Sequence, residues 1–237
     1  MKVSSATSVG KVRSLNEDAF FVSDVCKDTV LAIVADGMGG HNAGEVASAE
    51  AVNAIKDGDF CSGKDIKTVL SDAIACANNT IYKMSTKNPQ LHGMGTTATA
   101  CAISDNKVTA AHVGDSRLYL IHKGEMTQIT KDHSLVEMLI ENGTITKEDA
   151  KNHPQKNVIT RAIGTSNSVE CDIYEFSTEA EDIILLCTDG LVNMVDDNKI
   201  LSLVSDEKDF EGLAERLVKE AEDAGGHDNI TVVLIKF

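Results

Sequence analysis

Five aspartates stand at the ends of apolar, strand-like segments of this sequence. They are Asp18, Asp36, Asp115, Asp189 and Asp228. One aspartate in such a place ordinarily caps a helix or makes a turn, so a single one predicts little. As a set they can meet only where those strand ends share one rim of the fold, and bare carboxylates gathered there would repel one another. Oxygen ligands favour hard cations, so the set predicts a magnesium or manganese site.

A basic residue in the same part of the sequence indicates a phosphate. Arg13 lies five residues before Asp18 and four before Glu17, a further candidate ligand. A guanidinium group binds a phosphoryl group through two parallel hydrogen bonds. The alternative is a surface arginine that pairs with Glu17 and contributes little to stability. Both interpretations of Arg13 stay open at this point.

The glycine-rich segment 37–45 does not predict a nucleotide site. Gly39 and Gly44 have the spacing of a phosphate-binding loop, but Glu45 and Val46 stand where that loop needs Lys and Ser or Thr. A carboxylate at that place would oppose the phosphates. The glycines that follow two of the aspartates have another use, because they let the backbone approach a metal or turn sharply.

The six cysteines do not indicate thiol chemistry. No two of them have the C-x-x-C spacing of a zinc or redox site, and none is followed six positions later by Arg, as the cysteine-nucleophile phosphatases require. Cys76, Cys101 and Cys187 lie in apolar stretches. We expect them to be small buried side chains in a reducing compartment.

The composition excludes several classes of function. The chain has 237 residues, a net charge of −15, and six Phe and three Tyr but no Trp. An acidic surface repels nucleic-acid phosphates and anionic membranes, and so few aromatics make a poor base-stacking platform. The sequence has neither an apolar run of membrane-spanning length nor a signal-peptide pattern at its start, so a cytoplasmic location is expected.

The elements that must position these residues are mostly strands. Apolar runs predict strands over 18–25, 29–35, 96–103, 107–113, 117–122, 182–187 and 230–235, and helical spacing predicts helices over 43–55, 64–84, 134–141 and 211–222. The strands leave too little room for crossover helices, so the sheets should be antiparallel. We expect an α+β fold, a four-layer α-β-β-α sandwich of two mostly antiparallel sheets flanked by helices, in a single domain over 1–237.

Six short motifs complete the pattern. They are Arg13-x-x-Asn16-Glu17-Asp18-Ala19, Ala35-Asp36-Gly37-Met38-Gly39-Gly40, Gly95-Thr96-Thr97, Gly114-Asp115-Ser116-Arg117, Thr188-Asp189-Gly190-Leu191 and Asp228-Asn229. Over residues 10–237 the chain resembles the metal-dependent type 2C protein phosphatases, and it looks most like their compact bacterial members. Each motif alone is weak, but six in order form a strong signal. The family fold, two antiparallel sheets between helix layers, agrees with the layer order expected above.

The resemblance implies a catalytic site with two metal ions. Asp36 would bridge the ions, and Asp189 and Asp228 would complete the protein ligands of the first. Arg13 would hold the substrate phosphate. The resemblance assigns catalysis to Arg13 and Asp36.

The resemblance also implies the ligands of the second and third ions. The Gly37 carbonyl would bind the second ion, with Glu17 or Asp18 acting there partly through water. Asp115, together with Asp189, would form the third metal site described for bacterial relatives. The cofactors are therefore expected to be two Mn²⁺ or Mg²⁺ ions, with a possible third.

Beside this site the resemblance implies a mobile flap over residues 131–165, which includes Asp132, His133 and Ser134. One position departs from the animal members of the family. Met38 stands where they have a histidine that is proposed as general acid, and a thioether donates no proton. A metal-bound water or His41 are the alternatives for that step.

The expected reaction is one-step hydrolysis of phosphoserine or phosphothreonine by a metal-activated water. We expect phosphorylated proteins and a cognate Ser/Thr kinase as partners. The protein is expected to be a monomer. One alternative is a catalytically weak, phosphatase-like module that binds metal and phosphoprotein, although Asp36, Asp189 and Asp228 are all present. The other is a metallophosphoesterase for small phosphates, whose G-D-x-x-D-R-G and G-N-H-[DE] signatures are absent.

Overall fold

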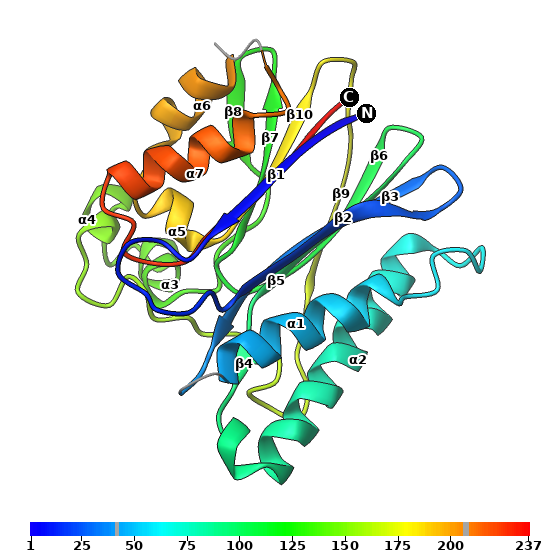
Figure 1. Cartoon of the computed structure of the whole chain (residues 1–237), viewed down its shortest axis with the longest axis vertical. Helices are drawn as coiled ribbons and strands as arrows, with labels where there is room; N and C mark the ends of the chain where they lie inside the picture. The colour runs from blue at the N-terminus through cyan, green and yellow to red at the C-terminus, as the bar shows by residue number, and fades with distance from the viewer. Residues whose placement is uncertain (41–42, 206–208) are drawn as a thin grey trace.

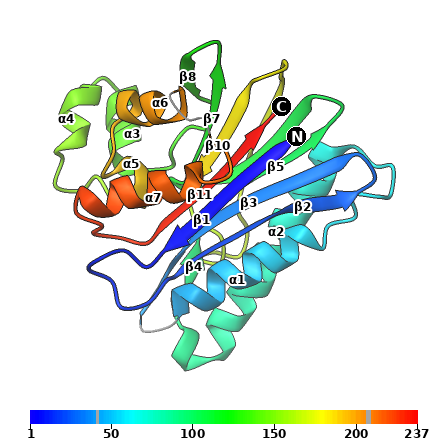
Figure 2. The same cartoon turned by 45° about the horizontal axis from the view of Figure 1, so that its top comes forward.

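Two antiparallel β-sheets lie face to face in the middle of the molecule, and helices cover the outer face of each sheet (Figures 1 and 2). A computed structural model describes residues 1–40, 43–205 and 209–237. The paired strands within these ranges all run antiparallel. The four-layer α-β-β-α sandwich expected from the sequence is confirmed.

The strands of both sheets come from distant parts of the chain. The first sheet, named the β1 sheet, contains in spatial order β1 (Lys2–Ser8), β11 (Ile230–Lys236), β10 (Ile183–Cys187), β7 (Arg117–His122) and β8 (Glu125–Gln128). The second, named the β3 sheet, contains in spatial order β2 (Asp18–Cys26), β3 (Thr29–Met38), β5 (Ala98–Ser104), β6 (Lys107–Val113) and β9 (Asp172–Ser177). A short strand, β4 (Gly95–Thr96), pairs with the end of β3.

Strand β3 is buried along most of its length, as its continuous apolar run predicts. Alternate residues from Val30 to Val34 belong to the core between the two sheets. The intervening residues from Leu31 to Ala35 belong to the core under the helices. Successive side chains of a strand point to opposite faces, so a strand between two cores must be apolar at every position.

Helices α1 (Ala43–Lys56) and α2 (Ile66–Lys87) cover the outer face of the β3 sheet (Figure 1). The 3- and 4-residue spacing of apolar residues that predicts α2 is the spacing of one helix face. The residues of that face are buried: Val69, Leu70, Ala73, Ile74, Ala77 and Ile81. A 3-10 turn, η1 (Pro89–Leu91), follows α2.

Helices α5 (Asp189–Val192), α6 (Asp197–Ser205) and α7 (Leu213–Asp223) pack over a separate apolar core on the β1 sheet. Two short helices, α3 (Leu135–Glu141) and α4 (Lys147–Lys151), lie between β8 and β9 in the chain. In the described ranges no helix has both the length and the apolar character that crossing a bilayer requires.

Several elements were not predicted, and most of the missing strands are edge strands. β1 and β8 form the edges of one sheet, and β9 forms an edge of the other. β1 is largely polar, and its only fully buried residue is Ser4. An edge strand with one solvated side has no apolar run to reveal it. The remaining omissions are the helices α4 to α6, of which α4 and α5 have only five and four residues, too few for helical periodicity to show.

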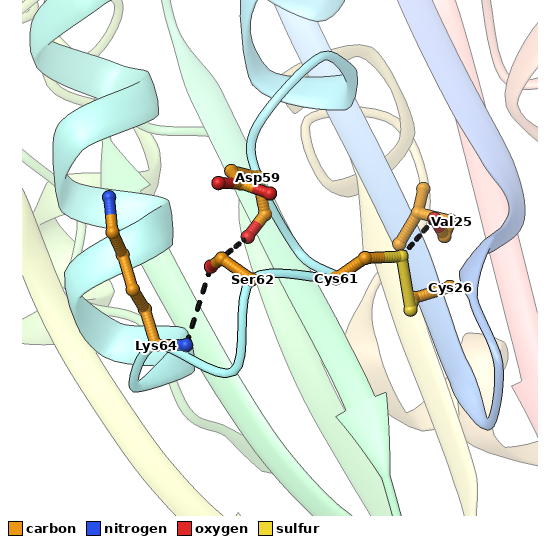
Figure 3. Close-up of a disulfide and its surroundings, with 6 residues drawn as sticks. All are labelled: Val25, Cys26, Asp59, Cys61, Ser62 and Lys64. Carbon is orange, nitrogen blue, oxygen red and sulfur yellow. Dashed lines mark hydrogen bonds between the residues drawn. A yellow bond between two sulfur atoms is a disulfide. The ribbon is translucent and has the colours of Figure 1, made fainter.

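A disulfide joins Cys26, at the end of β2, to Cys61, in the connection after α1 (Figure 3). This bond was not predicted. The prediction of a buried side chain is confirmed for Cys101 and Cys187 and is wrong for Cys76. Cys76 lies on the solvent face of α2, because the apolar residues around it in sequence occupy the opposite face.

Candidate active site

Asp18 and Asp36 lie opposite each other at one end of the β3 sheet, where the register of β2 and β3 pairs their Cα atoms. The backbone of Asp36 is held from its other side. Its N–H donates to the Thr97 hydroxyl at 2.9 Å, and its carbonyl accepts from the Thr97 N–H and the Thr96 hydroxyl, each at 2.9 Å. The two threonines after Gly95 therefore fix the strand end that carries Asp36.

Asp189 and Asp228 come from the β1 sheet. Asp189 begins α5 directly after β10, and Asp228 lies just before β11, the neighbour of β10. The hydroxyls of Thr188 and Thr231 both donate to Asp18 Oδ2, at 2.8 and 2.7 Å. These two bonds connect the sheets, so aspartates from both sheets meet at one rim.

Asp115 lies in the turn between β6 and β7, where the chain passes from one sheet to the other. Its neighbour Ser116 is buried and shares a hydrogen bond of 2.8 Å with the Thr97 hydroxyl. Thr97 also holds Asp36, so one side chain relates the two aspartate-bearing segments. Asp115 is close enough to Asp189 for their charges to interact.

The pKa values of these carboxyl groups follow from their crowding. Burial, then the charges of the neighbouring aspartates, raise the pKa of Asp36 well above its usual range. Burial likewise raises the pKa of Asp18 to about 7, of Asp115 to about 8 and of Asp189 to about 6, and like charges add to each effect. The cluster therefore repels its own negative charge, which a bound cation would offset.

The oxygens of this cluster suit a hard divalent cation. Three carboxylate oxygens are buried without a hydrogen-bond partner among the described residues: Glu17 Oε1, Asp18 Oδ1 and Asp189 Oδ1. An unpaired buried carboxylate oxygen is costly, and oxygen donors of this kind are the ligands that Mg²⁺ and Mn²⁺ prefer.

The side chains are not already arranged around a single ion. No group of three or more His, Cys, Asp or Glu side chains in residues 1–40, 43–205 and 209–237 is disposed to hold a metal as it stands. The reason lies in their protein partners, since Asp228 Oδ2 accepts from Arg13 and Asp189 Oδ2 accepts from Asn193, each at 2.9 Å. The donor set fits the cation by its chemistry.

Glu17 and Gly37 lie where α1 meets the β3 sheet. The Gly37 N–H donates to the Glu17 carbonyl at 3.0 Å, and burial raises the pKa of the Glu17 carboxyl. A Cβ at Gly37 would lie 2.1 Å from the Gly44 carbonyl oxygen, and one at Gly44 would lie 2.5 Å from Glu17 Oε1. Both glycines are needed for the close approach of the α1 start to β3.

The guanidinium of Arg13 faces the same cluster. Its Nη2 donates to Asp228 Oδ2 at 2.9 Å, and half of the side chain is exposed. The charge of Asp228, followed by those of Glu17 and Asp36, raises the pKa of Arg13. Arg13 is therefore a half-exposed surface residue, and its ion-pair partner is Asp228 and not Glu17.

The comparisons with known proteins agree with this geometry. A sequence model of the family described as Protein phosphatase 2C matches residues 7–234. The chain belongs to the protein phosphatase 2C family. The Listeria monocytogenes protein named Serine/threonine phosphatase stp is 39% identical to this 2C chain over 235 residues, which cover 97% of this chain and 93% of that protein.

Solved structures of other phosphatases have the same fold as this 2C chain. The S. agalactiae serine/threonine phosphatase matches it with a TM-score of 0.92 and 38% identity, over 98% of each chain. The catalytic domain of the serine threonine protein phosphatase PstP, solved in complex with two manganese ions, matches with a TM-score of 0.88 and 37% identity. That match covers 98% of this chain and 96% of the other.

Asp132, His133 and Ser134 anchor the segment 131–165 of this 2C chain to the Asp115 turn and to α3. The Asp132 carboxylate accepts three hydrogen bonds of 2.7–3.0 Å from Arg117. The His133 N–H donates to the Gly114 carbonyl at 2.7 Å, and His133 Nδ1 accepts from the Gly114 N–H at 3.0 Å. Ser134 caps α3. These three residues hold the base of the segment, and among the described residues none of their hydrogen bonds reaches the acidic cluster.

The sequence motifs include three of the four polar residues that support the aspartates, but sequence reasoning assigned none of the four a role. They are Thr97, Thr188, Thr231 and Asn229, and all four are at least 95% buried. The available signal was their place beside a motif aspartate or within an apolar strand, where a hydroxyl or amide needs a partner. Met38, which stands where the animal members have a histidine, pairs with Gly95 across β3 and β4. His41, one of the two alternatives for the general acid, lies outside the described residues.

Proposed function

We propose that this chain hydrolyses phosphoserine and phosphothreonine esters in proteins, with residues 1–237 acting as one catalytic unit. The observation that carries the proposal is the meeting of aspartates from both sheets with the Arg13 guanidinium at one rim. The carboxylates suit a divalent cation, and the guanidinium suits a phosphate. Membership of the 2C family and the named phosphatases among its relatives support the reaction class.

Seven residues would hold the ions. They are Glu17, Asp18, Asp36, Gly37 through its carbonyl, Asp115, Asp189 and Asp228. Asp36 would be shared by two ions, and Asp115 with Asp189 would serve a third. When bound, Mn²⁺ or Mg²⁺ lowers the pKa of a coordinated water and stabilises the negative charge of the phosphoryl oxygens. The manganese ions of the PstP structure support this choice of cofactor.

Arg13 would bind the phosphate of the substrate. Its side chain is half exposed, and only Nη2 is engaged with Asp228. The remaining N–H groups of the guanidinium can reach two phosphoryl oxygens at once, which orients the ester and offsets charge as the bond to the leaving group breaks.

The chain offers water, and not a thiol, as the nucleophile. Burial raises the pKa of Cys101 and of Cys187 to about 12, so neither carries a thiolate at neutral pH. Cys26 and Cys61 are joined to each other at the far end of β2. We expect direct attack by water in one step, without a covalent enzyme intermediate, because no cysteine of the chain is followed six positions later by Arg, as a cysteine-nucleophile phosphatase requires.

The cellular setting is also part of the proposal. We expect a cognate Ser/Thr kinase that acts on the same proteins, a monomeric enzyme and a cytoplasmic location. The net charge of −15 opposes nucleic acids as partners. The segment 131–165, anchored beside Asp115, is proposed to act as the flap that borders the bound substrate.

Hydrolysis of a phosphothreonine peptide tests the function. We expect turnover with Mn²⁺, none with EDTA, and a loss of about 100-fold or more in Asp36→Asn, because the aspartate shared by two ions is removed. Metal-independent turnover, or an Asp36→Asn enzyme of undiminished rate, would reject the proposal.

The same assay separates the alternatives. A module that only binds would retain the phosphopeptide in the presence of Mn²⁺ without releasing phosphate. A metallophosphoesterase for small phosphates would hydrolyse nucleotides or sugar phosphates faster than the peptide. Either result would replace the proposed function.

A further inference from the structure

The segment from Val9 to Glu17 carries Arg13 and is named the Arg13 loop. It contains no helix or strand, and residues 11–14 are exposed. Packing in the core cannot fix such a stretch, so its position must come from hydrogen bonds at its two ends. The partners of those ends therefore decide where the Arg13 guanidinium lies.

One side chain, Asn229, provides three of these bonds and reaches both ends of the loop. Its Nδ2 donates to the Val9 carbonyl at 3.0 Å and to the Leu15 carbonyl at 2.9 Å, and its Oδ1 accepts from the Glu17 N–H at 2.8 Å. The amide thus bridges the start and the end of the loop across the exposed residues between them. Asn229 is only 5% exposed, and these three bonds use both of its donors and its acceptor.

The backbone that carries Asn229 is rigid. The residue lies directly before β11, which is paired on both sides by β1 and β10. A Cβ on Gly190 would lie 1.9 Å from the Asn229 carbonyl oxygen, so the start of α5 packs against this position without a gap. A fixed backbone and a fully bonded amide make Asn229 a platform for the loop.

Further contacts seat the loop on the same segment. The Lys11 N–H donates to the Gly226 carbonyl at 2.8 Å. Gly10 has φ of +75°, and a Cβ there would lie 2.2 Å from the Asp228 carbonyl oxygen. The backbone of the loop therefore rests on residues 226–229. Asp228 accepts a hydrogen bond from the Arg13 guanidinium. Two adjacent residues therefore act on the loop: Asn229 holds its backbone and Asp228 holds the end of the Arg13 side chain.

We propose that Asn229 is a positioning residue for Arg13, which sets the place of the substrate phosphate through the backbone of the Arg13 loop. The inference rests on the proposed function, because it assigns Arg13 to that phosphate. Asn229 is neutral, and the three hydrogen bonds of its side chain all go to backbone groups. Its removal should therefore act on the loop that carries Arg13 more than on the carboxylates that would bind metal.

The test is a double-mutant cycle between Asn229→Ala and Arg13→Ala on a phosphothreonine peptide with saturating Mn²⁺. Asn229→Ala should lower kcat/KM by about 10- to 100-fold, as a displaced catalytic group does. In the Arg13→Ala background the same change should cost no more than about twofold, since the group that Asn229 positions is absent. An undiminished loss in that background would overturn the proposal.

Asn78→Ala is the matched control. Asn78 is 2% exposed, its Nδ2 donates to the Ser166 carbonyl at 3.1 Å, and its Oδ1 accepts from the Gly164 N–H at 2.8 Å. It is a buried amide that holds another loop, so its effect should be additive with Arg13→Ala. Equal coupling of Asn78 and Asn229 to Arg13 would show a general loss of stability and would reject the specific role.

Two further measurements separate this inference from the proposed function. Isothermal titration should give Asn229→Ala a smaller fold-loss of Mn²⁺ affinity than of kcat/KM, because its amide holds only the backbone of Glu17, and an equal or larger loss would assign Asn229 to the metal site instead. Hydrogen exchange of residues 10–16 should be faster in the variant, and unchanged exchange would overturn the inference even if the parent hydrolyses no phosphopeptide. Asn229→Ser, which keeps one donor, serves both measurements if the alanine variant does not fold.

Discussion

Besides Asp36, three carboxyl groups of the acidic cluster have pKa values above the ordinary range of an aspartate. They belong to Asp18, Asp115 and Asp189, and the values lie near 7, 8 and 6. The folded chain therefore holds protons at a pH where the unfolded chain has released them. Each such group stabilises the fold fully below its unfolded pKa, and that stabilisation is lost as the pH rises through the folded value.

The metal-free chain should therefore become less stable between pH 6.5 and 8.5. We expect the free energy of unfolding to fall by about 1–3 kcal/mol, or several degrees in Tm, in the presence of EDTA. His112 changes the stability in the opposite direction. Burial lowers its pKa to about 3, so its contribution to stability is lost as the pH falls below about 6.5. Above pH 6.5 the change in stability therefore reports on the aspartates and not on His112.

Thermal melts across this range measure the effect, and the matched control is the same series with saturating Mn²⁺. The cation holds the carboxylates ionised, so the fall should disappear or reverse. A Tm that rises with pH in EDTA would mean that the carboxyl groups are not mutually repelling in the folded chain.

At the scale of elements, the start of α1 determines where Glu17 lies. A helix glycine replaced by alanine ordinarily gains about 1 kcal/mol. At Gly44 the new Cβ would lie 2.5 Å from Glu17 Oε1 and 2.9 Å from the Gly37 carbonyl carbon. Gly44→Ala should instead cost about 1–3 kcal/mol and weaken Mn²⁺ binding, because α1 or Glu17 must move.

Chemical denaturation and titration with Mn²⁺ check this expectation. Gly40→Ala is the control, since a Cβ there would meet no atom within 4 Å. If Gly44→Ala is more stable than the parent and binds Mn²⁺ with unchanged affinity, α1 does not constrain Glu17.

The elements that a sequence predicts well are those buried on a whole face. The apolar run of β3 and the 3- and 4-residue spacing in α2 belong to that class. The two-residue turn at Asp105 and Asn106, with φ of 50° and 60°, also follows from local chemistry. β1 could not be predicted, because its partner β11 lies more than 200 residues away and only pairing makes it a strand.

The candidate site was predictable to the same degree. The aspartates could be found in the sequence because each ends or begins a strand. Their convergence could be predicted because five acidic residues at strand ends can meet only where those ends share one rim. The hydroxyl bonds from Thr188 and Thr231 to Asp18 could not be found, because they join residues 170 and 213 positions apart. The same holds for Asn229, whose amide bonds depend on the path of a loop with no pattern of its own.

At the scale of the whole molecule, the disulfide ties the far end of β2 to the connection after α1 (Figure 3). It spans 35 positions of sequence. Closing a loop of that size restricts the unfolded chain and stabilises the fold by about 3–4 kcal/mol in the chain-entropy description. Cys61 is exposed, so a reductant can reach the bond.

Reduction with dithiothreitol, or Cys26→Ser with Cys61→Ser, should lower Tm by roughly 10 °C. Phosphopeptide turnover at 25 °C should stay within about twofold, because eight residue steps of β2 place Asp18 roughly 26 Å from the disulfide. Cys76→Ser is the control and should keep the full response to reductant, since Cys76 is a free thiol. An equal Tm with and without reductant in the parent would show that the bond does not stabilise the fold.

The central claim is that aspartates from both sheets hold divalent cations together at one rim. The most direct measurement is an anomalous difference map from crystals of the chain grown with Mn²⁺. The account predicts two peaks that share the Asp36 carboxylate, one of them also bound by Asp189 and Asp228. Crystals grown at saturating Mn²⁺ that show no anomalous peak beside Asp36 would contradict the account.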